Sequence, residues 1–117
     1  MIAGIGVDLV DLARFEDQLE RTPALRQRLF HPLEANNAVR QLAGSFAAKE
    51  ALVKALGSPA GLSWTELRVW RDEKGRPILI SEGASSETIA AAGVSALHLS
   101  ISHDGGMLVA YVIAEAA

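Results

Sequence analysis

The 117-residue chain contains no cysteine, which excludes disulfide bonds, thiolate metal sites and a cysteine nucleophile. Its start lacks a basic leader followed by a long apolar core, so we expect no signal peptide. The longest unbroken apolar run, Met107 to Ala114, is far shorter than a membrane span. The net charge of −3 argues against general nucleic-acid binding. These absences fit a cytoplasmic protein with neither a membrane nor a nucleic-acid partner.

Several catalytic motifs are also missing. Gly4 and Gly6 form a lone Gly-x-Gly that lacks the third glycine and the Lys-Ser/Thr of a phosphate loop, and neither HExxH nor GxSxG occurs. There is no internal repeat and no linker. Half of the residues are apolar, and the length is that of one domain, so residues 1–117 are expected to fold as a single unit with a real core. The many alanines and leucines leave apolar surface for a subunit interface.

The segment from Phe46 to Gly57, FAAKEALVKALG, carries the strongest helix signal in the chain. Phe46, Glu50 and Lys54 recur every four residues and share one face, which places a carboxylate and an ammonium one turn apart. Taken alone, Glu50 and Lys54 are most simply an intrahelical ion pair. Gly57 supplies the left-handed conformation that commonly ends a helix. The apolar stripe consists of Ala48, Leu52, Ala55 and Leu56.

The first third of the chain predicts a buried strand and then helices. Asp8 lies near the end of the strand, where a carboxylate is costly unless it caps a turn, is paired or binds a cation. Asp11 suits a helix N-cap, and Thr22 and Pro23 suit the start of the next helix. The expected elements are a strand at 2–10, a helix at 12–21, a second helix with Leu25 and Leu29 on its inner side, and a third at 33–44.

Four arginines, Arg14, Arg21, Arg26 and Arg28, lie on the first two of these helices. They form either an ordinary solvated face or a docking surface for an acidic partner, because local charge decides local contacts.

The second half of the chain predicts two β-hairpins separated by a short helix. The helix starts at Ser85 or Ser86, ends near Ala92 and is followed by Gly93. The expected strands are 64–71 and 76–80 around the turn 72–75, and 97–103 and 107–113 around Asp104-Gly105-Gly106. The element order predicts an α+β fold with an antiparallel sheet packed on the long central helix.

Three weak chemical signals therefore fall in one small domain. Asp8 and Glu50 offer two hard carboxylates, the ligands that Mg²⁺ takes when waters and phosphate oxygens complete its shell. Lys54 can hold a phosphate oxygen or a leaving group. Ser102 and His103, at a hairpin tip, can bind another phosphate, although a lone histidine is more often a satisfied core residue. The residues indicate a magnesium and phosphate site.

Together these segments resemble the single-domain 4′-phosphopantetheinyl transferases, the holo-acyl-carrier-protein synthases. The resemblance lies in GIGVD at residues 4–8, FAAKEA at 46–51 with KALG at 54–57, and HLSISH at 98–103. Their order and spacing match over nearly the whole chain. The resemblance implies an enzyme that transfers 4′-phosphopantetheine from coenzyme A to a serine of apo acyl carrier protein and releases adenosine 3′,5′-bisphosphate.

The resemblance also implies site roles. Asp8 and Glu50 would hold Mg²⁺ against the coenzyme A pyrophosphate, and Lys54 would support the phosphate under attack. The nucleotide end would meet Ser102 and His103. The remaining implied contacts are Phe46 and Gly57 at the coenzyme pocket, and Arg14, Arg21 and Arg26 facing the carrier protein.

The family's single-domain members are homotrimers with sites between subunits, so Asp8 and Glu50 of one chain would meet His103 of a neighbour. The proton of the serine would pass to Glu50 through a water or to Asp104, and the sequence does not rank the two.

The chain departs from the family pattern at three places. Ser45 stands where members often carry a basic residue, Val10 stands where two-domain relatives place a third acidic ligand, and the segment 31–44 is short. Two alternatives to transfer stay open. One is a non-catalytic module that binds carrier protein or coenzyme A, and the other is a coenzyme A acyltransferase, which would need no Mg²⁺.

Overall fold

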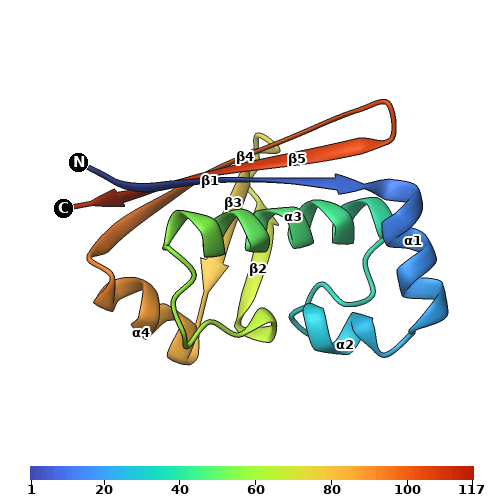
Figure 1. The fold of residues 1–117 in the computed structure, drawn as a ribbon, viewed down its shortest axis with the longest axis horizontal. Coiled ribbons are helices and arrows are strands. Elements are labelled where there is room, and N and C mark those ends of the chain that lie inside the picture. The colour runs from blue at the N-terminus through green and yellow to red at the C-terminus, as the bar shows by residue number, and fades with distance from the viewer.

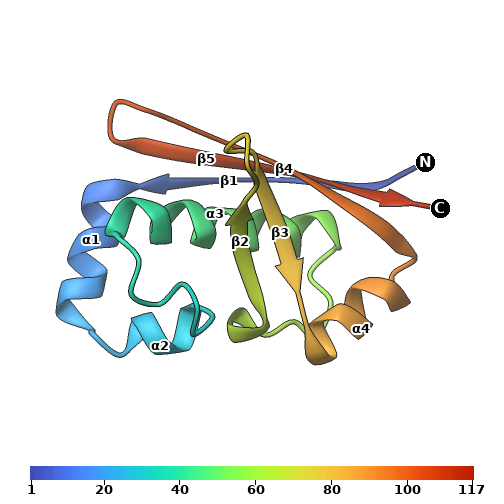
Figure 2. The ribbon, with the colours of Figure 1, turned by 180° about the vertical axis from the view of Figure 1, so that it is seen from behind.

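A long helix carries a three-stranded sheet on one side and a β-hairpin with shorter helices on the other (Figures 1 and 2). The computed structural model describes residues 1–117. In chain order the elements are β1 (Ile2–Asp11), α1 (Leu12–Arg21), α2 (Leu25–Leu29), α3 (Val39–Ala55), a 3-10 turn (Trp64–Glu66), β2 (Leu67–Arg71), β3 (Pro77–Ser81), α4 (Gly83–Ala91), β4 (Val94–Asp104) and β5 (Met107–Ala116). The predicted α+β class and the packing of an antiparallel sheet on a central helix are confirmed.

The larger sheet has the antiparallel order β1-β5-β4, so the first and last strands of the chain lie side by side and both termini emerge at one end (Figure 1). The register pairs Asp8 with Ala110 on β5. Side chains at every second position of these strands therefore face α3, and the side chains between them point away from the helix. The second sheet, β2 and β3, is a separate hairpin that crosses α3 on its opposite side (Figure 2).

The backbones of β1 and α3 are in direct contact. A Cβ atom added to Gly6 would lie 1.9 Å from the carbonyl oxygen of Ala51, and one added to Gly4 would lie 1.9 Å from that of Ala55. Only glycine on the strand and a small residue on the helix allow this approach. The contact brings the next inward residue of β1, Asp8, against α3.

Most predicted boundaries near the start of the chain are confirmed, and one helix is wrong. The strand at 2–10 and the helix at 12–21 are found as β1 and α1. The side chain of Asp11 caps α1 by accepting the N–H of Arg14 at 3.0 Å. Residues 33–37 form turns instead of helix, and residues 39–44 are the first part of α3, which runs on without a break. The turns form because the side chain of Glu34 points inward as a buried ion-pair partner.

Three smaller expectations are wrong. Thr22 caps no helix, because α2 starts at Leu25 after a turn and its N-cap, Ala24, offers no side-chain hydrogen bond. Residues 64–66 form a 3-10 turn, so the first hairpin strand starts at Leu67. The helix α4 begins at Gly83, before either predicted serine.

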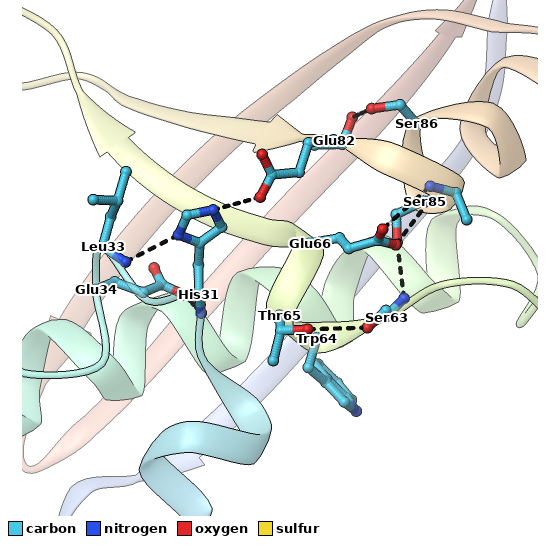
Figure 3. A network of polar contacts seen from close by, with 12 residues as sticks. His31, Leu33, Glu34, Ser63, Trp64, Thr65, Glu66, Glu82, Ser85 and Ser86 are labelled. Atoms are coloured by element: carbon cyan, nitrogen blue, oxygen red, sulfur yellow. Dashed lines mark hydrogen bonds and ion pairs between the residues drawn. The ribbon is translucent and has the colours of Figure 1, made fainter.

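A residue from outside α4 caps its start. Glu66 accepts the N–H groups of Ala84 at 3.2 Å and of Ser85 at 3.0 Å, and the hydroxyl of Ser85 at 2.8 Å (Figure 3). The same network includes His31, whose Nδ1 accepts the N–H of Leu33 at 3.0 Å. Nε2 of His31 lies 2.5 Å from Oε1 of Glu82, and this contact ties the loop before α3 to the segment that leads into α4.

Most of the remaining expectations agree with the structure. Gly57 follows α3 with φ +75°, the left-handed conformation that ends a helix. The last hairpin is found as β4 and β5, but its turn is only Gly105 and Gly106, because Asp104 ends β4 and pairs with Met107. None of the helices combines the length and the apolar character that crossing a membrane requires.

Candidate active site

Asp8, Glu50 and Lys54 meet where β1 lies against α3. The ammonium nitrogen of Lys54 is 3.2 Å from Oδ1 of Asp8 and donates to the carbonyl oxygen of Val7 at 3.0 Å. Glu50 lies one turn earlier on α3 and is half-buried. The side chain of Asp8 is 16% exposed and that of Lys54 is 53% exposed, so the ammonium reaches the carboxylate from the solvent side. The three predicted residues are therefore together.

The electrostatics of this cluster favour a bound cation. Burial raises the pKa of Glu50, the negative charge of Asp8 raises it further, and Lys54 only partly opposes the two. Because the ionised pair carries excess negative charge, a divalent cation would relieve the repulsion. Asp11 also lines the cavity but caps α1, and no group of three acidic or histidine side chains is placed to hold a metal ion. Two carboxylates are the kind of donor set that Mg²⁺ takes when waters and substrate oxygens complete its shell. Val10, which stands where two-domain relatives carry a third acidic ligand, is buried in the core and adds no charge to the site.

A cavity of about 210 Å³ opens on these carboxylates. Asp8 and Glu50 line it together with Arg14 from α1 and Phe46 from α3. The ring of Phe46 stacks on Trp64, with 5.6 Å between ring centroids and 20° between the planes. This stacking fixes the aromatic wall of the cavity, while the exposed Arg14 supplies positive charge at its edge.

The other two predicted arginines lie in different surroundings. Arg21 forms an exposed ion pair with Asp17 at 3.0 Å, at the far end of α1. Arg26 donates to the carbonyl oxygens of Ala35 and Asn37, both at 3.1 Å, and so fastens α2 to the loop before α3. Of the three predicted arginines, only Arg14 lines the cavity with the carboxylates.

Ser102 and His103 are not brought to the carboxylates within one chain. They lie at the exposed end of β4, beside Asp104, and together line another cavity at the tip of the last hairpin. His103 also reaches a larger cavity of about 370 Å³ between α3 and β2. Gly57 lies beyond the C-terminal end of α3, whereas Phe46 is near the middle of that helix, and Gly57 is exposed.

The sequence analysis missed a buried ion pair. Lys49 is fully buried and bonds Glu34, the carbonyl oxygen of Leu29 at 3.0 Å and that of Trp64 at 3.1 Å. Burial lowers the pKa of Lys49, and the hydrogen bond and charge of Glu34 oppose the shift. The spacing could have found this residue, because Lys49 lies three residues before the buried Leu52 and so shares its face of α3. The pair fixes the loop before α3 rather than touching the carboxylate cavity.

Both the sequence and the fold of the chain match those of known proteins. The sequence model of the 4′-phosphopantetheinyl transferase superfamily matches residues 4–112. The holo-[acyl-carrier-protein] synthase of Kocuria rhizophila is 56% identical over 99% of this chain and 94% of its own length. That of Clavibacter michiganensis is 53% identical over 98% of this chain and 97% of its own. The Helicobacter pylori holo-[acyl-carrier-protein] synthase, solved in complex with coenzyme A, superposes with a TM-score of 0.82 at 30% identity and covers 95% of this chain and 99% of its own.

Proposed function

Because this chain belongs to the 4′-phosphopantetheinyl transferase superfamily, we propose that it is a holo-acyl-carrier-protein synthase that acts as one domain, residues 1–117. It transfers 4′-phosphopantetheine from coenzyme A to a serine of apo acyl carrier protein. The likeness to relatives of that name over nearly the full length of both chains supports this reaction. The observation that carries the proposal is that Asp8 and Glu50 line one cavity while Lys54 contacts Asp8.

The reaction is a displacement at phosphorus. The serine oxygen of the carrier attacks the phosphorus that bears the pantetheine, and the bond from that phosphorus to the bridging oxygen of the pyrophosphate breaks. Adenosine 3′,5′-bisphosphate leaves with the bond electrons. Mg²⁺, when held by Asp8 and Glu50, supplies charge neutralisation at the pyrophosphate.

The residues of the chain position the reactants and the proton. Lys54 uses two of its three donors on Val7 and Asp8, and its third remains for a phosphate oxygen. Glu50 lines the cavity that the serine would enter, so it can take the serine proton through one water. Asp104 is exposed at the hairpin tip beside His103 and outside this cavity, so it would reach the serine only from a neighbouring subunit.

The carrier protein would dock at the edge of the cavity. Arg14 lies there, and its guanidinium can pair with a carboxylate of an acidic partner while the serine enters toward Glu50. We assign docking first to Arg14, with Arg21 as an exposed neighbour on the same helix. Arg26 contributes through the fold, since its donors hold the loop before α3.

The active unit would be a homotrimer with each site completed by a second subunit. The outer face of the larger sheet leaves apolar side chains exposed: Ile5 is 55%, Leu9 62% and Tyr111 45% exposed. An apolar face of this kind marks an interaction surface. The separation of His103 from the carboxylates within one chain is a second reason, because both are needed around one coenzyme A.

The test of transfer is a change in mass. The protein is mixed with apo acyl carrier protein, coenzyme A and Mg²⁺, and the carrier is weighed by mass spectrometry. We expect a gain of one phosphopantetheine that disappears when the metal is chelated and in Glu50→Gln. Glu87→Gln, an exposed acid on α4, is the matched control and should remain active.

The outcomes separate the candidate functions. A gain that persists in chelator would contradict the role given to Asp8 and Glu50. Binding of coenzyme A or carrier without any gain would leave a non-catalytic module, and transfer of an acyl group without Mg²⁺ would indicate an acyltransferase.

Sharing of the site is tested by complementation. Glu50→Gln and His103→Ala are each inactive alone under the proposal, and the two are refolded together. Each site would take Glu50 from one subunit and His103 from the next, so about one site in four of a random mixture combines an intact Glu50 with an intact His103. Roughly a quarter of the activity should therefore return. A mixture that stays inactive although sedimentation shows mixed trimers would contradict sharing of the site between subunits.

A further inference from the structure

A cavity of about 370 Å³ is distinct from the one that holds Asp8 and Glu50. It lies between the first half of α3, β2 and the tip of the last hairpin. Its volume is within the range of small-molecule sites. His103 lines it, which makes it the natural place for the nucleotide end of coenzyme A if the proposed function holds.

The floor of this cavity has no positive charge to offer a ligand. Ser45, which replaces the basic residue common in the family, is 4% exposed and donates its hydroxyl to Glu34 at 2.7 Å. Glu34 also accepts the N–H of Val69 at 3.2 Å and pairs with Lys49. Lys49 is fully buried beneath, so it neutralises Glu34 and does not reach the cavity itself.

Two arginines on the walls remain available. Arg40, on the first turn of α3, and Arg71, at the end of β2, both line the cavity and are exposed. Arg71 spends one of its five N–H donors on the carbonyl oxygen of Gly75 at 2.9 Å, which anchors the side chain against the hairpin turn. Arg40 takes part in none of the ion pairs of the structure. The two guanidinium groups approach one cavity from different elements.

The chemistry of coenzyme A identifies what they would bind. Its pyrophosphate is assigned to the carboxylate end of the site, and its remaining phosphate is the 3′-monoester beside the adenosine. Guanidinium groups match the oxygens of such a dianion in a bidentate way. We propose that Arg40 and Arg71 bind the 3′-phosphate of coenzyme A beside His103 and take the role that Ser45 cannot fill. This assignment rests on the proposed function.

The experiment compares ligands that differ only in that phosphate. Calorimetry measures the affinity of the full-length protein for adenosine 3′,5′-bisphosphate and for adenosine 5′-monophosphate. Arg40→Gln and Arg71→Gln should each weaken binding of the bisphosphate roughly 10- to 100-fold, the loss typical of a hydrogen bond to a charged group, and leave binding of the monophosphate unchanged. Arg68→Gln is the matched control, because this arginine lies on the same strand over the Trp70 ring and outside the cavity lining.

Kinetics supply the second readout. Each variant should raise KM for coenzyme A with kcat retained, and should change KM for dephospho-coenzyme A little. Melting temperatures of the exposed-arginine variants verify that they fold.

The proposal is overturned if the wild-type protein binds the two nucleotides equally, or if the arginine variants weaken both to the same degree. Its failure is distinct from failure of the proposed function. A protein that transfers phosphopantetheine but shows no arginine-dependent preference for the 3′-phosphate refutes this inference alone. A protein that shows the preference but transfers nothing refutes the transfer and keeps the phosphate site.

Discussion

Replacing Gly6 with alanine should damage both the stability and the active site. The new Cβ would lie 1.9 Å from the carbonyl oxygen of Ala51 and 2.8 Å from the amide nitrogen of Ala55. Both neighbours are backbone atoms of α3, which cannot rotate away as a side chain does. Relief requires β1 and α3 to separate by roughly 1.5 Å, because interiors are packed to ordinary van der Waals contact.

Separating β1 from α3 is expected to lower both the stability and the transfer rate. Overpacking of a core costs up to about 3 kcal/mol, and a clash with backbone belongs at that upper end. Asp8 follows Gly6 on the same face of β1, so it would move relative to Glu50 by about the same distance. A displacement on the order of 1 Å can cost about 100-fold in rate. Transfer to the carrier should therefore fall by about that factor while the protein remains folded.

Two assays measure these effects. Urea denaturation, in chelator and at fixed protein concentration, gives the free energy of unfolding, and the mass-based assay gives the transfer rate. Gly44→Ala is the matched control for stability, because its Cβ would meet only Leu108 and Ile101 side-chain atoms at 3.6 Å and beyond. Alanine should stabilise that helical position by about 0.5–1 kcal/mol. If Gly6→Ala unfolds like the wild type, the close-contact reasoning is wrong. If it is destabilised but transfers at the normal rate, the spacing of β1 and α3 does not set the site.

Three further predictions concern charged groups. Lys49→Met should lower the free energy of unfolding by about 3–5 kcal/mol in urea, since Glu34 keeps a buried charge without its partner, and adding Glu34→Gln should recover part of the loss. Burial and the neighbouring carboxylate of Asp8 raise the pKa of Glu50 in the fold, so its favourable contribution to stability is present below the unfolded pKa and is lost as pH rises through the folded pKa. Without metal, Glu50→Gln should therefore melt at a higher temperature than wild type at neutral pH, and the difference should vanish in acid. Glu66 has a lowered pKa because of its hydrogen bonds, first that from the Ser85 hydroxyl, so Glu66→Gln should melt lower than wild type at neutral pH, and the difference should shrink as pH falls through the folded pKa.

The fold was predictable where the sequence pattern is local. The strand with Gly4 and Gly6, the Asp11 cap and the glycine that ends α3 all act through neighbouring residues, and each is found as predicted. The start of α3 was not predictable in this way. A helix pattern at 33–44 loses to turns at 33–37 because the side chain of Glu34 is drawn inward by Lys49, a partner fifteen residues away. Tertiary contacts of this kind leave no periodic signal in the chain.

The candidate site likewise combines contacts that follow from local spacing with contacts that do not. Glu50 and Lys54 share a helix face by spacing alone, so their proximity follows from the sequence. That Asp8 joins them needed the resemblance to a family, since nothing local links β1 to α3. The arginines show the limit: Arg26 carries the same charge as Arg14, yet its donors are spent on the carbonyl oxygens of Ala35 and Asn37. The sequence shows the charge of each arginine, but only the fold shows whether its N–H donors are free to bind a partner.

The geometry also explains why small residues lie beside Asp8 and Glu50. Asp8 has a short side chain, so it reaches Glu50 only if the strand lies against the helix backbone, which the glycines of β1 and the alanines of α3 permit. Such an interface buries few methyl groups and contributes less hydrophobic stabilisation than leucines would. Burial at this interface, together with the nearby charge of Asp8, raises the pKa of Glu50, which costs stability at neutral pH. Both costs fall at one crossing of strand and helix, which is consistent with an arrangement that serves the binding of a cation rather than the stability of the fold.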